Sequence, residues 1–225
     1  MIVILALGGS VVVPVDKVDT VYAKEFTTLV NDLSKHHKIG IVVGGGKTAR
    51  KAIAEAKAAG KNQAECDYAG IEASRENAVE VAKIMGLTQK SIPENFKDAR
   101  TILDRNGIVI MGGTEPGHST DAVAMILGEY CNADLVINLT NVNGIYDKDP
   151  KTDKSARLLI EISAKKLEQM VANIAQHAGK YELMDMVAVK ILERSGIRCI
   201  ALNGRDLGNV KDAIEGRSFV GTIIH

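Results

Sequence analysis

The 225-residue sequence lacks the compositional features that mark several classes of protein. It has no tryptophan and only 4% aromatic residues, and 28 lysine and arginine residues balance 28 acidic residues. A neutral chain lacks the electrostatic footprint of a nucleic-acid-binding protein. We therefore expect no nucleic-acid partner, and any anion site must be a local cluster of basic groups and backbone N–H groups.

Cysteines and long apolar runs are also scarce. Cys66, Cys131 and Cys199 have neither the spacing of a zinc site nor the even number of a disulfide framework, so we expect no metal bound by protein ligands alone. No apolar run approaches the roughly 20 residues that a membrane helix needs. The apolar start, Met1–Leu7, is too short for a signal sequence. The sequence predicts a cytoplasmic protein without a membrane partner.

Short apolar segments alternate with longer segments of helical period. This alternation is typical of a parallel sheet covered on both faces and joined by right-handed crossovers. We expect strands at Ile2–Leu7, Ile39–Val43, Ile108–Met111, Leu135–Leu139 and Ile197–Leu202. We expect helices at Asp19–His37, Thr48–Ala59, Ile71–Met85, Thr120–Cys131, Ala164–Ala175 and Leu183–Ser195. The pattern predicts one α/β domain over residues 1–225, a three-layer αβα sandwich with a central, mostly parallel sheet and a lobe boundary near residue 150.

Glycine clusters follow three of the predicted strands. They are Gly8-Gly9-Ser10, Gly44-Gly45-Gly46-Lys47 and Gly112-Gly113-Thr114. In a parallel sheet the carboxyl ends of the strands share one edge, and ligands bind there. Loops with bare backbone N–H groups at helix N-termini hold phosphates well. A tight turn alone would explain one such pair, but three at equivalent positions indicate a phosphate site.

The middle cluster partly matches two nucleotide-binding motifs. It ends like a P-loop, but position 41, where that motif needs glycine, is Ile41. Gly44-x-Gly46-x-x-Ala49 matches the dinucleotide fingerprint, which leaves a nicotinamide-dependent oxidoreductase as an alternative. That alternative needs an acidic residue about 20 positions further on, at the end of a second strand. Glu65 and Asp67 lie near that distance, but the sequence before them is polar and does not resemble a strand.

Basic and polar residues gather around the same predicted edge. Lys47, Arg50 and Lys51 open one helix and Arg75 lies in the next, where positive charge opposes the helix dipole unless an anion is present. The segments at 114–121 and 140–150 also follow strands. Ser119 or Thr120 could simply cap a helix, and Asn143-Gly144 could simply form a turn, but both segments are equally suited to a ligand role. Tyr146 is a candidate for lining a purine-binding pocket.

These motifs resemble a known family. Gly8-Gly9-Ser10, the glycine cluster before Lys47, Gly112-Gly-Thr-x-Pro-Gly-His118, and Thr140-Asn-Val-Asn-Gly-Ile-Tyr146 with Asp149-Pro150 look like the amino acid kinase superfamily. Within it the chain resembles archaeal-type uridylate kinases from Met1 to Gly221-Thr222. The resemblance implies phosphoryl transfer from MgATP to UMP, with Mg²⁺ held mainly by the nucleotide phosphates. It also implies an acceptor side before about residue 150, a donor side after it, and a homohexamer.

The resemblance assigns residues to each substrate. It implies ATP binding by Gly9, Ser10, Gly46, Arg50, Thr140, Asn141, Tyr146 and Asp149. It implies UMP binding by Gly45, Asp67, Thr114, Glu115, Pro116, Gly117, His118, Ser119 and Thr120. Lys190 stands where superfamily members carry a lysine near the transferring phosphate. Many relatives also carry a lysine at the position of Ala6, and Lys47 is our candidate replacement for that missing cation.

The chemistry agrees with this resemblance. A phosphate acceptor is already a nucleophilic dianion near neutral pH, so it needs no general base, and the sequence offers no convincing nucleophile–base pair. Isopentenyl phosphate kinases have a histidine beside their glycine loop, where this chain has Val43. Acylphosphate-forming kinases of the superfamily are usually longer. A non-enzymatic anion-storage or sensor role would not need the nucleoside segment at 140–146.

Overall fold

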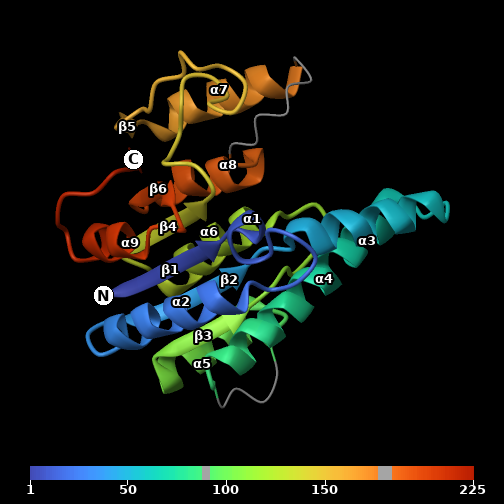
Figure 1. The fold of residues 1–225 in the computed structure, drawn as a ribbon, viewed down its shortest axis with the longest axis horizontal. Coiled ribbons are helices and arrows are strands. Elements are labelled where there is room, and N and C mark those ends of the chain that lie inside the picture. The colour runs from blue at the N-terminus through green and yellow to red at the C-terminus, as the bar shows by residue number, and fades with distance from the viewer. Residues whose placement is uncertain (88–91, 177–183) are drawn as a thin grey trace.

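A computed structural model of the chain describes residues 1–87, 92–176 and 184–225 (Figure 1). In this part of the chain seven strands form one sheet in the order β3-β2-β1-β4-β6-β7-β5. The strands are β1 (Ile2–Leu7), β2 (Lys38–Val43), β3 (Ile108–Met111), β4 (Leu135–Thr140), β5 (Glu161–Ile162), β6 (Cys199–Asn203) and β7 (Thr222–Ile224). Their pairings are parallel except that of β6 with β7, which is antiparallel. The mostly parallel α/β fold is confirmed.

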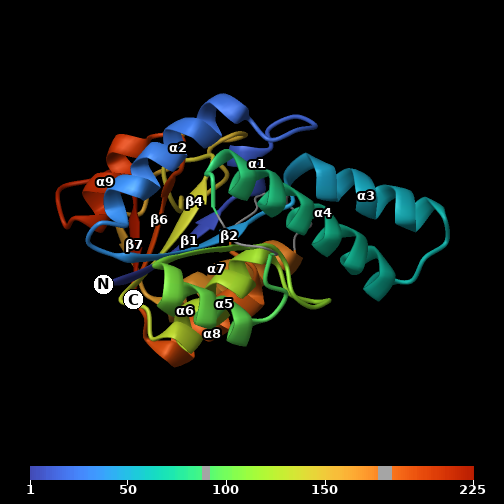
Figure 2. The same cartoon turned by 90° about the horizontal axis from the view of Figure 1, so that it is seen from below.

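Helices cover both faces of the sheet, as Figure 2 shows. The helices are α1 (Gly9–Val12), α2 (Thr20–Leu33), α3 (Gly46–Ala58), α4 (Gln63–Ile84), α5 (Phe96–Asn106), α6 (Thr120–Cys131), α7 (Ala164–Gln176), α8 (Met186–Ser195) and α9 (Leu207–Ile214). Helices α2 and α9 lie on one face, and α5, α6 and α8 lie on the other. Helices α3 and α4 pack along each other and project from the body as a hairpin.

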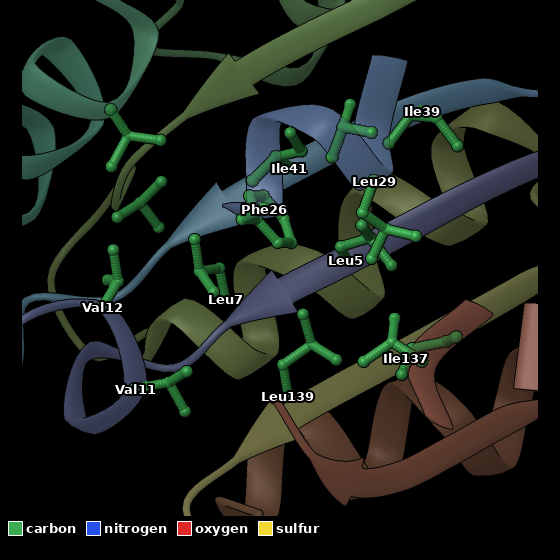
Figure 3. Close-up of a cluster of buried hydrophobic side chains, with 14 of the residues drawn as sticks. Leu5, Leu7, Val11, Val12, Phe26, Leu29, Ile39, Ile41, Ile137 and Leu139 are labelled. Carbon is green, nitrogen blue, oxygen red and sulfur yellow. The ribbon is translucent and has the colours of Figure 1, made fainter. Parts of the chain in front are cut away.

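The central strands are mostly apolar because both faces of the sheet are buried; Asn138 of β4 is a buried polar exception. Leu5 and Leu7 of β1 pack on the α2 side with Phe26 (Figure 3). Val3 belongs to the same core. Ile4, on the opposite face of the strand, packs on the α6 side. Successive side chains of a strand point to opposite faces of the sheet, so alternate residues pack into two separate cores, and both faces of the strand are mainly apolar.

Helix α4 begins eight residues before the predicted helix at Ile71. The side chain of Asn62 accepts a hydrogen bond from the N–H of Glu65, and the Glu65 side chain accepts one from the N–H of Asn62. This capping box starts the helix at Gln63, between the predicted helices at Thr48–Ala59 and Ile71–Met85. Helices α1, α5 and α9 and the short strands β5 and β7 are not among the predicted elements. The predicted start of α8 at Leu183 lies outside the described residues.

The position of α4 removes the support for a nicotinamide site. Glu65 and Asp67 lie in the first turns of a helix, whereas that alternative needs an acidic residue at the end of a strand.

Among the described residues, no helix is long and apolar enough to cross a membrane.

Candidate functional site

Two of the three glycine loops touch each other at the carboxyl edge of the sheet. A Cβ atom on Gly9 would lie 2.0 Å from the nitrogen of Gly46, and one on Gly44 would lie 2.4 Å from the nitrogen of Gly9. Only glycine permits this approach of two backbones. The third loop lies against α4 instead, because a Cβ atom on Gly112 would lie 2.7 Å from the nitrogen of Arg75.

The first two loops open onto a cavity of about 280 Å³, here called the sheet-edge pocket. It is lined by residues of β4 and β6, by the segments that follow β1, β2 and β4, by the first turns of α3 and α6, and by the residues just before α8. Its lining residues are Gly8, Gly9, Ser10, Gly44, Gly45, Gly46, Arg50, Ser119, Thr120, Asp121, Asn138, Leu139, Thr140, Val142, Gly144, Ile145, Met184, Asp185 and Ala201.

A second cavity of about 570 Å³, here called the α4 pocket, lies beside the first. Helices α3, α4 and α8 and the loop before α6 enclose it. Its lining residues are Gly45, Ala49, Ile53, Asp67, Gly70, Ile71, Ser74, Gly113, Gly117, His118, Ser119, Thr120, Asp185, Met186 and Val187. Four residues line both pockets: Gly45, Ser119, Thr120 and Asp185. Ligands in the two pockets would therefore meet at these four residues.

Two helix N-termini converge at this junction. The Ser119 side chain caps α6 by accepting from the N–H of Ala122 at 3.1 Å, and Asp185 caps α8 by accepting from the N–H of Ala188 at 2.9 Å. The Ser119 hydroxyl also donates to the Asp185 carboxylate. The positive ends of both helix dipoles thus face the place where the pockets meet, which favours negative charge there.

The backbone of Gly45 and Gly46 forms an anion-binding nest at the same junction. Gly45 is right-handed helical (φ −73°, ψ −26°), and Gly46 has φ +58° in the left-handed region. A right-handed residue followed by a left-handed one turns successive N–H groups toward one point. Within the part of the chain that the structure describes, the N–H groups of Gly45, Gly46 and Lys47 have no protein acceptor. These N–H groups are available to a ligand.

The loop before α6 is held against α4 by side chains of that helix. Asp67 accepts from the N–H of Gly117 at 3.0 Å, and the Ser74 hydroxyl accepts from the N–H of Gly113 at 2.8 Å. Arg75 donates to the carbonyls of Gly113 and Thr114 and pairs with Glu94 at 2.7 Å. Arg75 is therefore committed to holding this loop.

Two buried polar atoms of the same loop have no partner among the described residues. They are the Thr114 hydroxyl, in a side chain that is 3% exposed, and Nδ1 of His118. An unsatisfied buried polar atom costs free energy unless a ligand or water pairs with it. His118 lines the α4 pocket, whereas the neighbouring Glu115 and Pro116 do not.

The predicted cations differ in where they lie. Arg50 lines the sheet-edge pocket, and Lys47 is exposed at the start of α3, next to Gly46. Lys190 lines neither pocket: its ammonium pairs with Glu168 at 2.8 Å and Glu193 at 3.1 Å, and its side chain is 53% exposed. The hydrogen bond to Glu168, more than that to Glu193, raises the pKa of Lys190. The structure does not bring Lys190 to the site, because it faces α7 rather than the pockets.

The segment after β4 is only partly in contact with the sheet-edge pocket. Thr140 lines the pocket, as do Val142, Gly144 and Ile145, whereas Asn141, Tyr146 and Asp149 do not. Tyr146 forms an isolated bridge with Leu158. The Asp149 carboxylate accepts from the N–H of Lys151 at 2.9 Å, so it shapes its own turn.

Sequence reasoning missed several residues that line the pockets, among them the polar residues Asp185 and Asn138. Asp185 lines both, and Asn138, buried on β4, lines the sheet-edge pocket. A polar residue in the apolar β4 segment was a readable signal for Asn138. An aspartate before an apolar helix signals a cap, but nothing in the sequence places that cap opposite Ser119.

The fold and the paired pockets define an α/β protein with a site suited to phosphate-bearing ligands at the carboxyl edge of its sheet. The sequence profile described as the amino acid kinase family matches residues 1–203, and the chain belongs to that family. It is 40% identical over 223 residues to a uridylate kinase of Methanobrevibacter smithii, covering 99% of this chain and 98% of that protein. It is 38% identical over 224 residues to a uridylate kinase of Archaeoglobus fulgidus, covering both chains completely.

Solved structures agree with the sequence comparison. The crystal structure of the uridylate kinase from Archaeoglobus fulgidus has a TM-score of 0.89 at 37% identity and covers 100% of both chains. The UMP kinase of Bacillus anthracis has a TM-score of 0.80 at 18% identity, covering 100% of this chain and 95% of that one. The second match concerns the fold alone.

Proposed function

We propose that this chain is a nucleoside monophosphate kinase that transfers the γ-phosphoryl group of MgATP to UMP, giving ADP and UDP. One observation carries the proposal: two pockets of nucleotide dimensions adjoin and share Gly45, Ser119, Thr120 and Asp185. A direct transfer needs both substrates bound with their phosphates end to end. The full-length relatives named uridylate kinase support UMP as the acceptor.

The sheet-edge pocket is the proposed ATP site. Gly9, Ser10 and Gly46 would face the phosphates, and Arg50 would pair with them from α3. Thr140 would contact the nucleoside. Asn141, Tyr146 and Asp149 lie just beyond the lining residues, and we propose that they shape the adenine end by fixing the course of the segment after β4.

The α4 pocket is the proposed UMP site. Asp67 would accept a hydrogen bond from the ribose, and Gly45 would contact the phosphate from the nest. The run Gly117, His118, Ser119 and Thr120 would bind uracil and phosphate. The unpaired Thr114 hydroxyl and His118 Nδ1 supply polar atoms for the ligand. Glu115 and Pro116 would act by shaping the loop.

The chemistry needs alignment and charge stabilisation rather than proton transfer. A phosphate oxygen of UMP attacks the γ-phosphorus, a new P–O bond forms, and the bond to the β,γ-bridging oxygen breaks as ADP leaves. The UMP phosphate is largely dianionic near neutral pH, so no base is required. The nest and the N-termini of α6 and α8 lie where charge develops, and Arg50 with Lys47 supplies the proposed positive charge. Magnesium enters as part of the MgATP substrate.

We further propose the cellular setting that follows from this reaction. UDP is a precursor of UTP and CTP, so the enzyme would serve pyrimidine nucleotide synthesis in the cytoplasm. Residues 1–225 would act as one domain, with UMP bound mainly by residues before about 150. We also propose that the chain assembles as a homohexamer, as the resemblance implies.

A coupled ADP-release assay tests the proposal. Purified protein is incubated with ATP, Mg²⁺ and one nucleoside monophosphate at a time, with an assay without acceptor as the control. Turnover with UMP well above turnover with AMP or GMP supports the assignment. Turnover with none of the monophosphates would overturn it.

A further inference from the structure

Asn77, on α4, makes no contact with either pocket, yet its side chain holds the nest at their junction. The Nδ2 atom of Asn77 lies 3.1 Å from the carbonyl oxygens of both Gly44 and Gly45 and 3.1 Å from the Thr48 hydroxyl. Asn77 is 5% exposed. A buried carboxamide with this many partners on one loop fixes the orientation of that loop.

Thr48 completes the arrangement from the first turn of α3. Its hydroxyl donates to the Gly45 carbonyl at 2.6 Å while it accepts from Asn77. The Gly45 carbonyl also accepts from the N–H of Ala49 at 3.1 Å. The carbonyls of Gly44 and Gly45 are therefore both held toward α4.

Because the peptide group is planar, the direction of these carbonyls also fixes the direction of the N–H groups on the opposite side of the loop. In a planar trans peptide the C=O and N–H groups point in opposite directions. With the carbonyls of Gly44 and Gly45 held toward Asn77, the N–H groups of Gly45 and Gly46 must point away from α4. That side faces the Gly8–Gly9 loop, because a Cβ atom on Gly9 would lie 2.0 Å from the nitrogen of Gly46.

The same helix fixes the other loop of the junction. Ser74, one turn before Asn77, accepts from the N–H of Gly113, and Asp67 accepts from the N–H of Gly117. These three residues are spaced by seven and three positions, so they share one face of α4. Helix α4 thus sets the position of the nest relative to the loop that lines the α4 pocket.

We propose that Asn77, assisted by Thr48, is a positioning residue for phosphoryl transfer: it keeps the N–H groups of Gly45 and Gly46 aimed at the phosphoryl group in transit. The inference rests on the proposed function for the identity of the two substrates. Because Gly45 lies where the pockets meet, replacing Asn77 should destabilise the transition state for transfer more than it weakens the binding of either substrate.

The test compares isosteric variants. Asn77→Asp replaces the donating amide by an oxygen that repels the two carbonyls. Thr48→Val removes the hydroxyl at constant shape, and Thr48→Ser keeps it. Glu76→Gln, at an exposed position beside Asn77, is the matched control. Each variant is assayed for kcat and for the KM of ATP and UMP, and its melting temperature is measured in parallel.

We expect Asn77→Asp to lower kcat by about 10- to 100-fold and to change each KM by less than about threefold. This fall in kcat is smaller than the fall expected when a donor at the reacting centre itself is removed. Thr48→Val should lower kcat by about fivefold or more, while Thr48→Ser and Glu76→Gln should stay within about twofold. If Asn77→Asp melts below the assay temperature, the two Thr48 variants decide the question. An unchanged kcat in Asn77→Asp, or equal losses in Thr48→Val and Thr48→Ser, would overturn the proposal.

A binding measurement separates this inference from the proposed function. MgADP with aluminium fluoride and UMP mimics the phosphoryl group in transit, whereas MgADP alone and UMP alone do not. Asn77→Asp should weaken the ternary complex by about the factor lost in kcat and leave both binary affinities within about threefold. Equal affinity of wild type and variant for the ternary complex would contradict the role of Asn77. If the wild-type protein does not phosphorylate UMP, the proposed function fails. The binding of MgADP with beryllium fluoride then tests Asn77 without UMP. Weaker binding of this complex by Asn77→Asp than by wild type supports the role of Asn77, and equal binding overturns it.

Discussion

The carboxylate of Asp67 accepts a hydrogen bond from the N–H of Gly117 at 3.0 Å, although fifty residues separate them. The contact joins α4 to the loop before α6, and both residues line the α4 pocket. The Gln63 side chain donates to the other carboxylate oxygen at 2.9 Å. Asp67 therefore lies where α4 meets the loop before α6 in the lining of the pocket, and hydrogen bonds to both of its oxygens fix its carboxylate without a ligand.

Replacing Asp67 by alanine should weaken UMP binding more than ATP binding. The change removes both the proposed ribose acceptor and the anchor of Gly117, and a lost charge-assisted hydrogen bond costs about 1.5–3 kcal/mol. We expect the KM for UMP to rise by at least about tenfold and the KM for ATP by less than threefold. Asp67→Asn, which keeps one acceptor oxygen, should lie between alanine and wild type.

Steady-state kinetics with each substrate varied in turn measures this difference. Glu72→Gln, an exposed change on the same helix, serves as the control and should leave both KM values unchanged. Equal increases of the two KM values in Asp67→Ala would remove the ribose assignment.

The close approach of two glycine loops predicts that Gly9 tolerates no side chain. In Gly9→Ala the new Cβ atom would lie 2.0 Å from the Gly46 nitrogen, so the two backbones must separate. We expect a loss of about 1–3 kcal/mol in the free energy of unfolding, as for other overpacked sites, and at least tenfold weaker binding of MgADP. Urea unfolding and calorimetric titration measure the two effects.

Gly208→Ala is the matched control for Gly9→Ala. Gly208 lies in α9, and a Cβ atom there would lie 3.5 Å from Oδ1 of Asp206, an ordinary contact. Alanine favours helix over glycine, so this variant should be at least as stable as wild type. MgADP binding by Gly9→Ala at the wild-type affinity would mean that the two loops do not form a common phosphate site.

Two lysines suggested by the sequence should now behave differently. Lys47 adjoins the nest in sequence, and Lys47→Ala should lower kcat by about tenfold or more if its ammonium reaches the transferred phosphoryl group. Lys190 pairs with Glu168 and Glu193, and Lys190→Ala should keep kcat within about twofold. The same ADP-release assay measures both variants. A large loss in Lys190→Ala would return that residue to the catalytic set.

The ion pairs between α2 and α9 predict an acid-dependent loss of stability. Hydrogen bonds from Lys211 and then Lys35 lower the pKa of Asp32 to about 2, from an ordinary value near 3.8. The unfolded chain therefore takes up this proton more readily, so the stabilisation is complete above about pH 4 and is lost as the pH falls toward 2. The effect is small and salt-sensitive because the carboxylate is exposed.

Urea unfolding between pH 5 and pH 2 at low salt tests the Asp32 prediction. Asp32→Asn should show a shallower decline of the free energy of unfolding across this range than wild type. Asp16→Asn, a change of an exposed aspartate in the loop before α2, should follow wild type. Identical pH slopes for Asp32→Asn and wild type would show that the contacts to Lys211 and Lys35 do not stabilise the folded state.

Five of the seven strands and the glycine loops were predictable because their signals are local, whereas the short strands β5 and β7 were not predicted. The five predicted strands are mainly apolar runs whose side chains are buried in the two cores, and each glycine cluster comes directly after a strand. The first half of α4 was not predictable from periodicity. It projects beside α3 with exposed and half-buried residues in no clear helical period, so the capping box at Asn62 and Glu65 is the signal that indicates the helix.

The parts of the site that the sequence could not reveal depend on contacts between distant segments. Asp185 lies 66 residues from Ser119, and Asn77 lies 32 residues from Gly45; only the fold brings each pair together. Lys190 is the opposite case, since the sequence suggested it for the site and the structure places it outside the pockets. The helical period of α8 does not show which neighbouring helix contacts the face that carries Lys190. Its pairing with Glu168 on α7 decides that question.

The most direct test of the whole account is the rate of ADP release from MgATP with each nucleoside monophosphate in turn. Two adjoining pockets that hold donor and acceptor end to end predict fast, saturable turnover with UMP, much slower turnover with AMP and GMP, and a background rate without acceptor. Turnover that is the same with and without UMP, or a preference for a purine monophosphate, would contradict it.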